Sequence, residues 1–286
     1  ESNRIDDDAS ETLPVIRSGV NFKAAENTHL RASYGQGYRY PSIAEKYTST
    51  RVGSIVIYPN DSVTSETGQT AELGIKQGFR IGGVEGYLDV AAFWSEYKDM
   101  MEFTFGKYGT FTDPFFGLGF KSKNIGNTRI TGFEIEAVGG GNIGKTPLTF
   151  LAGFTYIEPI ALDYDKAKAE NENTADFNIL KYRYRRVLKA DVEAKPGKWI
   201  LGSSVRYNSF MDNIDKFFEE TIPGIKDYRS VHNYGDWVFD ARVDEQRLDA
   251  HRRGHRHGPR PAGLYPRALA RQRCVGVASC PHHVCG

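Results

Sequence analysis

Apolar and polar residues alternate along most of this chain, and the alternation limits the folds that it can adopt. In Leu148–Tyr156 the even-numbered residues are all apolar, and in Leu188–Ala194 the apolar residues alternate with Lys189, Asp191 and Glu193. A period of two indicates β-strands with one apolar and one polar face. The pattern recurs at 15–22, 29–34, 71–76, 85–94, 132–137, 148–156, 188–194, 199–207 and 237–243. We therefore expect an all-β protein with about nine strands.

The connections between these segments alternate between short and long. Tight turns are expected at 25–28, 80–83, 139–146 and 195–198. Long, aromatic and charged loops are expected at 39–65, 104–126, 158–184 and 211–235. Short turns at one end and long loops at the other are typical of an antiparallel transmembrane β-barrel, whereas a soluble β-sandwich shares only the alternation. Because nine is an odd number, we expect part of a barrel and not a closed one.

The average composition is compatible with a barrel. Mean hydropathy is −0.50 and no apolar run reaches the roughly 18 residues of a transmembrane helix, but barrel strands keep the average polar. Aromatic residues make up 13% of the chain, and several, such as Tyr34, Trp94 and Tyr207, fall near the long loops, where interfacial girdles lie. On this interpretation Val90 faces lipid and Asp89 faces the lumen. The chain opens on polar and acidic residues, so we expect any signal peptide to lie outside it.

Residues 244–286 differ in composition from residues 1–243. They hold all three cysteines, five of the seven histidines and eight arginines, and their net charge is +5 against −4 for the rest of a chain whose total is +1. No strand or helix period runs through them. We predict that this tail is disordered and translated out of frame. The alternative is a zinc site, although the spacing matches no familiar zinc finger; its ligands would be Cys274, Cys280, His282, His283 and Cys285.

Four segments resemble the barrel of TonB-dependent receptors, in the order that the family has. LRASYGQGYRYPSIAEKY (Leu30–Tyr47) resembles the family segment R-x-S-y-G-q-G-f-R-x-P-s-x-x-E. SETGQTAELGIKQGF (Ser65–Phe79) and GYLDVAAFWSEYKDMMEF (Gly86–Phe103) resemble the next two strands. NIGNTRITGFEIEAVG (Asn124–Gly139) resembles the segment N-x-G-x-x-x-x-x-G-x-E-x-E that follows. Residues 1–243 are thus similar to the C-terminal portion of such a barrel, in the style of receptors from Bacteroidetes-type bacteria.

The resemblance implies a barrel of about 22 strands in the bacterial outer membrane, closed by an N-terminal plug. A TonB complex pulls on that plug, and we expect the plug and its TonB box to lie outside this chain. The implied function is active import of a scarce small-molecule ligand such as a ferric siderophore, with outer-membrane lipid as a further partner, no cofactor and no nucleic acid. Alternatives are a passive porin or a TonB-dependent glycan importer and, from another class, a barrel enzyme or a soluble sugar-binding β protein.

Arginine and tyrosine in the long loops are the candidates for ligand binding, because they suit an anionic or catecholate-bearing ligand. The candidates are Arg39, Tyr40, Glu45, Tyr47, Tyr58, Tyr182, Arg183, Tyr184 and Phe217. The alternative is that these aromatic residues pack on one another and that Arg39 and Glu45 simply pair. No catalytic or metal site is predicted. GGGNIGKT (Gly139–Thr146) matches the spacing of a phosphate loop, but a strand and not a helix is expected after it.

Overall fold

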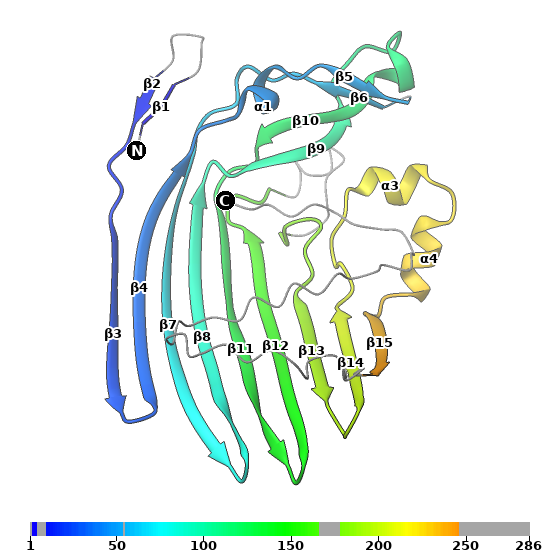
Figure 1. Ribbon diagram of the computed structural model, residues 1–286. Coiled ribbons are helices and arrows are strands. Elements are labelled where there is room, and N and C mark those ends of the chain that lie inside the picture. Colours follow the sequence, from blue (N-terminus) through cyan, green and yellow to red (C-terminus); the bar gives the residue numbers. More distant parts are fainter. Residues whose placement is uncertain (1, 5–9, 54, 166–177, 246–286) are drawn as a thin grey trace, which may run out of the picture. The chain divides into compact units, whose positions relative to one another are not determined.

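The computed structural model describes residues 2–4, 10–53, 55–165 and 178–245 (Figure 1). The predictions made for the tail and for its zinc ligands fall outside these residues, apart from Asp244 and Glu245. Residues 166–177 of the third long loop also fall outside them.

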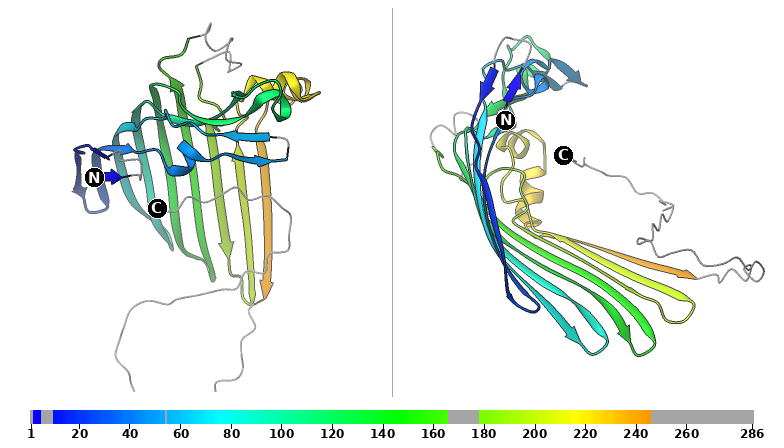
Figure 2. Two further views of the ribbon diagram at one scale, coloured as in Figure 1. Left: turned by 90° about the horizontal axis from the view of Figure 1, so that it is seen from above. Right: turned by 60° about the vertical axis from the view of Figure 1, so that its left-hand side comes forward.

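Nine strands form one antiparallel sheet, as the alternation predicted. Neighbours in the chain are neighbours in the sheet, in the order β15-β14-β13-β12-β11-β8-β7-β4-β3. The strands are β3 (Arg17–Ala25), β4 (Thr28–Arg39), β7 (Glu66–Ile81), β8 (Val84–Lys98), β11 (Thr128–Ile143), β12 (Thr146–Ala161), β13 (Arg186–Ala194), β14 (Trp199–Asn208) and β15 (Asp236–Glu245). The sheet is curved (Figure 2), and neither β3 nor β15 pairs with a further strand among the described residues. The outer backbone edges of both strands are therefore open as far as the structure describes the chain.

The register aligns apolar side chains into a row that crosses all nine strands. Directly paired residues point to the same face of a sheet. The row is Phe22, Leu30, Ile75, Val90, Ile135, Phe154, Leu188, Tyr207 and Trp237. We call the face that carries this row the apolar face, and the opposite one the polar face. Side chains of the row are open to the surroundings, with Phe22 60% and Trp237 54% exposed.

The polar face carries charged residues that pair with one another across the strands. Asp89 accepts a hydrogen bond from Arg31 at 2.6 Å, and Glu72 accepts one from the same guanidinium at 2.8 Å. Lys76 lies over the ring of Tyr87, 3.6 Å from its centroid. Val90 and Asp89 therefore lie on opposite faces, as the alternation predicted.

Tight turns join the strands at one end of the sheet (Figure 1). The prediction of a turn over 139–146 was too long, because β11 runs to Ile143 and only Gly144 and Lys145 connect it to β12. Gly144 has φ +63°, which glycine adopts without strain. Gly139 belongs to the strand, and the ring of Phe150 occupies the space that a Cβ there would need, at 2.6 Å.

The long connections at the other end are folded, which the sequence did not predict. The first contains α1 (Ile43–Tyr47), β5 (Thr50–Val52) and β6 (Ile55–Tyr58); the second contains β9 (Met101–Lys107), the 3-10 helix η1 (Pro114–Gly117) and β10 (Leu118–Asn124). These strands form a second sheet of order β5-β6-β10-β9. The fourth connection contains α3 (Lys216–Thr221) and α4 (Ile225–Val231), and β1 (Ser2–Arg4) pairs with β2 (Ser10–Thr12) near the N-terminus.

Buried apolar side chains are concentrated in these connections and not in the large sheet. Val63, Met101, Phe105, Leu180 and Phe217 are all less than 9% exposed. Within the described strands of the large sheet, the comparably buried apolar residues are Ala91, at 5% exposed, and Pro159, below 2%. No helix in the described parts of the chain is long and apolar enough to cross a membrane.

Candidate ligand-binding surface

The described parts of the four long connections contact one another, and we call them together the loop layer (residues 40–65, 99–127, 162–165 with 178–185, and 209–235). The first and second connections join where β6 runs parallel to β10, with Val56 opposite Gly119. Asn60 adds a hydrogen bond from its side-chain amide to the carbonyl of Ser122 at 2.7 Å. These two loops therefore form one structural unit.

Arg39 and Glu45, two of the predicted ligand residues, pair with each other at 2.6 Å. Glu45 also completes a capping box at the start of α1, accepting from the backbone N–H of Ser42 at 2.8 Å while the Ser42 hydroxyl accepts from the backbone N–H of Glu45. Burial opposes ionisation of Glu45, but the bonds from Arg39 and Ser42 outweigh it and hold its pKa below the ordinary value. Both side chains thus have a structural task.

Tyr182, a third candidate, is held in an unusual backbone conformation. Its φ is +58°, which is rare for a bulky side chain and is found where the surroundings hold a residue in place. Its hydroxyl donates to Asp215 at 2.8 Å and its backbone N–H donates to the carbonyl of Asn213 at 2.9 Å. Burial, followed by the charge of Asp215, raises the pKa of Tyr182, so its hydroxyl stays protonated.

Asp215 links the third connection to the fourth. It is 1% exposed, and its carboxylate pairs with Lys181 in addition to Tyr182. A buried carboxylate is tolerated because a cation and a hydroxyl donor both face it. Neither Lys181 nor Asp215 was predicted, because their pairing brings together residues far apart in the sequence.

Arg183, the next candidate, links the third connection to the second. Its guanidinium lies 3.5 Å from the Glu102 carboxylate on β9. Glu102 is 12% exposed in its side chain, and burial raises its pKa although Arg183 and Lys181 act in the opposite direction. Together Glu102, Lys181, Tyr182, Arg183 and Asp215 form a group that we call the loop junction.

Phe217, the candidate in the fourth connection, packs against the second. Its ring centroid lies 4.5 Å from that of Phe105, and the ring of Phe218 lies 5.2 Å from Phe105 on another side. Phe217 is 7% exposed and Phe105 is 3% exposed. The structure therefore places Phe217 in the interior of the loop layer.

The remaining four candidates are tyrosines of the loop layer. The ammonium group of Lys46 lies 5.7 Å from the ring of Tyr40 and 5.9 Å from that of Tyr47. The ring of Tyr58 meets Tyr108 edge-on, with centroids 6.2 Å apart. The Tyr58 hydroxyl is buried and has no hydrogen-bond partner among the described residues. Burial raises the pKa of Tyr58. Tyr47 and Tyr184, at 43% and 36% exposed, are among the candidates open to a ligand.

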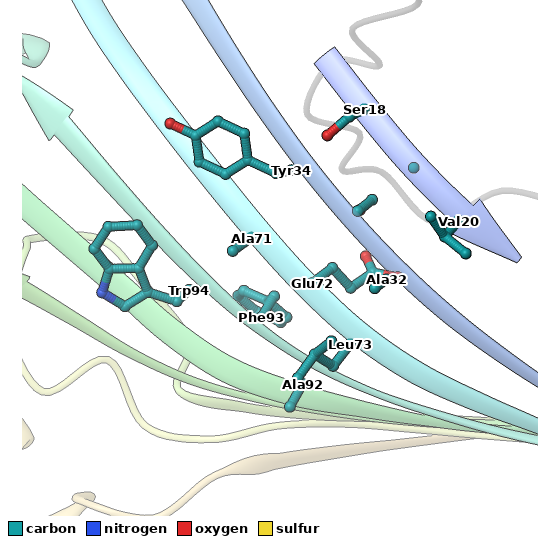
Figure 3. A pocket seen from close by; sticks show the side chains of 12 residues that line it. Ser18, Val20, Ala32, Tyr34, Ala71, Glu72, Leu73, Ala92, Phe93 and Trp94 are labelled. Atoms are coloured by element: carbon teal, nitrogen blue, oxygen red, sulfur yellow. The ribbon is translucent and has the colours of Figure 1, made fainter. Parts of the chain in front are cut away.

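A large hollow lies elsewhere, on the apolar face (Figure 3). Its volume is about 550 Å³, and its floor is made by small side chains, Ala32, Ala71 and Ala92, beside the larger Tyr34 and Trp94. Glu72 also lines the hollow, but its carboxylate pairs with Arg31 on the polar face. The hollow shares no residue with the candidates. It belongs to the apolar face of the sheet and not to the loop layer.

The described residues contain no group of three or more His, Cys, Asp or Glu side chains that could hold a metal ion. The loop layer instead offers tyrosine rings and guanidinium groups, which bind by stacking and by charge-assisted hydrogen bonds.

Long antiparallel strands with one apolar face, tight turns at one end and folded loops at the other define the class of transmembrane β-barrel proteins. A family model described as "TonB dependent receptor-like, beta-barrel" matches residues 2–252. The chain belongs to this family, whose members are transport receptors of the bacterial outer membrane, and the expectation of a partial receptor barrel is confirmed.

Solved structures agree on the fold. The copper transporter OprC is 14% identical with a TM-score of 0.54, over 82% of this chain and 31% of its own. The ferric-catecholate import receptor Fiu from E. coli K12 is 17% identical with a TM-score of 0.52, over 82% of this chain and 28% of its own. The hemophore receptor HasR of Serratia marcescens is 16% identical with a TM-score of 0.52, over 82% and 34%. The chain thus spans about a third of the length of these structures, and no curated protein matches it.

Proposed function

We propose that this chain is part of the barrel of an outer-membrane importer that binds an anionic iron chelate, such as a ferric catecholate siderophore, at its loop layer. The observation that carries the proposal is the gathering of tyrosine and arginine at the loop end of the sheet, on loops that hold one another in place. Tyrosine rings stack on catecholate rings, and guanidinium groups pair with their oxygens. The ferric-catecholate import receptor Fiu has a similar fold.

The proposal includes a position in the membrane. The apolar face contacts acyl chains and the polar face borders a hydrated lumen, because an exposed apolar row is stable only against an apolar surrounding. The open edges of β3 and β15 need partners in hydrocarbon, where each unpaired backbone group costs several kcal/mol. Further strands of a longer chain supply those partners in this proposal. Transport moves the ligand without chemical change, and energy reaches the barrel from a TonB complex through a plug.

Uptake of radiolabelled iron by cells tests this function. Cells that produce the receptor should accumulate iron from a ferric catecholate, and the accumulation should disappear when the TonB complex is removed. Tyr184→Ala together with Arg183→Ala should weaken binding of the ferric catecholate by about ten-fold, as expected for the loss of one stacking and one charge-assisted contact. Arg80→Ala, at the turn end of the sheet, is the control. Uptake that persists without the TonB complex would favour a passive porin, and unchanged binding in the double variant would exclude this part of the loop layer.

A further inference from the structure

Arg186 is a charged residue on the apolar face. It pairs in register with Tyr156, and the next residue of β13 on the same face, Leu188, pairs with Phe154. The rings of Phe154 and Tyr156 both lie within 6 Å of Phe133, at 5.9 and 5.6 Å, so these side chains share one face. Arg186 therefore lies on the same face as the apolar row, two residues nearer to the loop layer.

The guanidinium of Arg186 has no ion pair or side-chain hydrogen bond among the described residues, and the residue is exposed. Its neighbour Arg185 is different. Arg185 lies 3.4 Å from Asp212 and 3.8 Å from Glu158, and it donates to the Tyr156 hydroxyl at 3.2 Å. Arg185 thus engages the carboxylates of both Asp212 and Glu158. Within the part of the chain that the structure describes, Arg186 has no carboxylate to compensate its charge.

A hollow of about 260 Å³ lies beside Arg186 (its strand, β13, is marked in Figure 1). Its lining combines the two arginines and Asp212 with hydroxyl and amide groups and with aromatic rings: Arg185, Arg186, Tyr207, Ser209, Phe210, Asp212, Asn233, Tyr234 and Gly235. The Tyr207 ring also packs on Trp237, with centroids 4.6 Å apart. Tyrosine and tryptophan gather where hydrocarbon meets headgroups. The hollow therefore lies at the level of lipid headgroups if the apolar face contacts lipid, as the proposed function holds.

We propose that Arg186 and this hollow bind the phosphate group of a membrane lipid. An arginine on a lipid-facing surface costs about 2–4 kcal/mol at the midplane and much less when it reaches the interface. Long basic side chains bend toward headgroups, and a phosphate accepts two parallel bonds from a guanidinium. The exposed side-chain amide of Asn233 supplies a further donor, while Arg185 neutralises Asp212. The site anchors this edge of the barrel to the headgroup layer and has no part in ligand import.

Native mass spectrometry of the receptor, extracted from membranes in nonionic detergent, tests the site. The probes are phosphatidylglycerol and a diacylglycerol with the same acyl chains but no phosphate. We expect retention of phosphatidylglycerol to fall about five-fold in Arg186→Gln, the effect of one basic residue near a charged membrane surface. Retention of diacylglycerol should not change. Arg206→Gln is the matched control, because Arg206 lies on the polar face and contacts Asp240 at 3.4 Å; it should retain phosphatidylglycerol like the unchanged protein.

The outcomes separate the possible sources of phosphate. Arg186→Lys keeps the charge and should retain most of the bound phosphatidylglycerol, which distinguishes loss of charge from a folding defect. Equal retention by Arg186→Gln and by the unchanged protein would overturn the proposal. Displacement of the lipid by inorganic phosphate at matched concentration would also overturn it, because the site would then bind a free anion. Lipid retention is read without siderophore, so its failure is distinguishable from failure of the import function.

Discussion

The large sheet and the loop layer are stabilised in opposite ways, although one chain builds both. The sheet leaves its apolar side chains open, with Leu73 at 68% and Phe22 at 60% exposed, and it depends on strand pairing. The loop layer encloses Phe105, Phe217 and Asp215 at 7% exposure or less. A sheet that exposes apolar side chains needs an apolar surrounding, whereas a layer with its own interior is stable in water. The difference indicates that the two regions face different solvents.

The largest expected effect is the loss of stability when a side chain is removed from the interior of the loop layer. Phe105→Ala should cost about 3–5 kcal/mol of local unfolding free energy, because it empties the contact among three aromatic rings. Hydrogen exchange should accelerate in β9 and α3 and remain unchanged in β7, β8 and β11. Phe111→Ala is the control, since Phe111 is 72% exposed. Faster exchange throughout the large sheet would mean that the two regions are not stabilised independently.

The next prediction compares the two faces of the sheet by placing an arginine on each of them. Ile135→Arg places a charge in the apolar row and should cost about 2–4 kcal/mol if the row is near the membrane midplane. Glu134→Arg lies one residue away on the polar face and should be tolerated. The fraction of compact barrel on an unheated gel measures both. Equal loss of compact barrel in the two variants would contradict the assignment of the faces.

A smaller effect concerns the contact between the third and fourth connections. Asp215→Asn keeps an acceptor for Tyr182 but leaves Lys181 without its counter-charge, at a cost of about 1–3 kcal/mol. Protease cleavage within residues 178–185 should therefore become faster. Asp163→Asn, in the third connection but outside the loop junction, is the control. Unchanged cleavage in Asp215→Asn would show that the ion pair does not hold the loops together.

The smallest effect is a dependence on pH. Burial raises the folded-state pKa of Glu102, so the protonated form is favoured in the folded loop layer. Its contribution to stability is present at low pH and is lost as pH rises through the raised pKa, the reverse of an ordinary paired carboxylate. Hydrogen exchange in β9 should accelerate as the pH rises through this pKa, and Glu102→Gln should remove the pH dependence. A dependence that persists in Glu102→Gln would assign it to another group.

The sequence was sufficient to predict the large sheet because its strands carry their own signal. Side chains at every second position decide which face meets which solvent. The alternation located all nine strands, although β7 and β11 extend well beyond the segments in which it was visible. The strands β5, β6, β9 and β10 are shorter and pair across the sheet's long connections, so their partners are not visible locally. For β6 and β10 the pairing is parallel, between residues about 60 positions apart.

The roles of the candidate residues could be predicted only in part, because they too depend on contacts between distant segments of the chain. Composition identified the long loops and their tyrosines and arginines. It was also compatible with pairing of Arg39 and Glu45 in place of ligand binding, and the structure contains this pair. Composition could not show that Phe217 is interior or that Tyr182 is fixed by Asp215, because both depend on contacts between different loops. Tyr47 and Tyr184 are exposed whereas Phe217 is buried. Nothing in the sequence alone distinguishes these aromatic residues from one another.

The central claim is that the apolar face contacts lipid while the polar face borders water. Spin labels attached to single cysteines at 133, 134, 135, 136 and 137, with the three native cysteines replaced, measure this directly in the membrane-embedded receptor. Collision with oxygen, which concentrates in hydrocarbon, should be high at the odd positions, and collision with a water-soluble nickel complex should be high at the even ones. A two-residue alternation is the predicted result. Equal access of the nickel complex to all five positions would contradict the account.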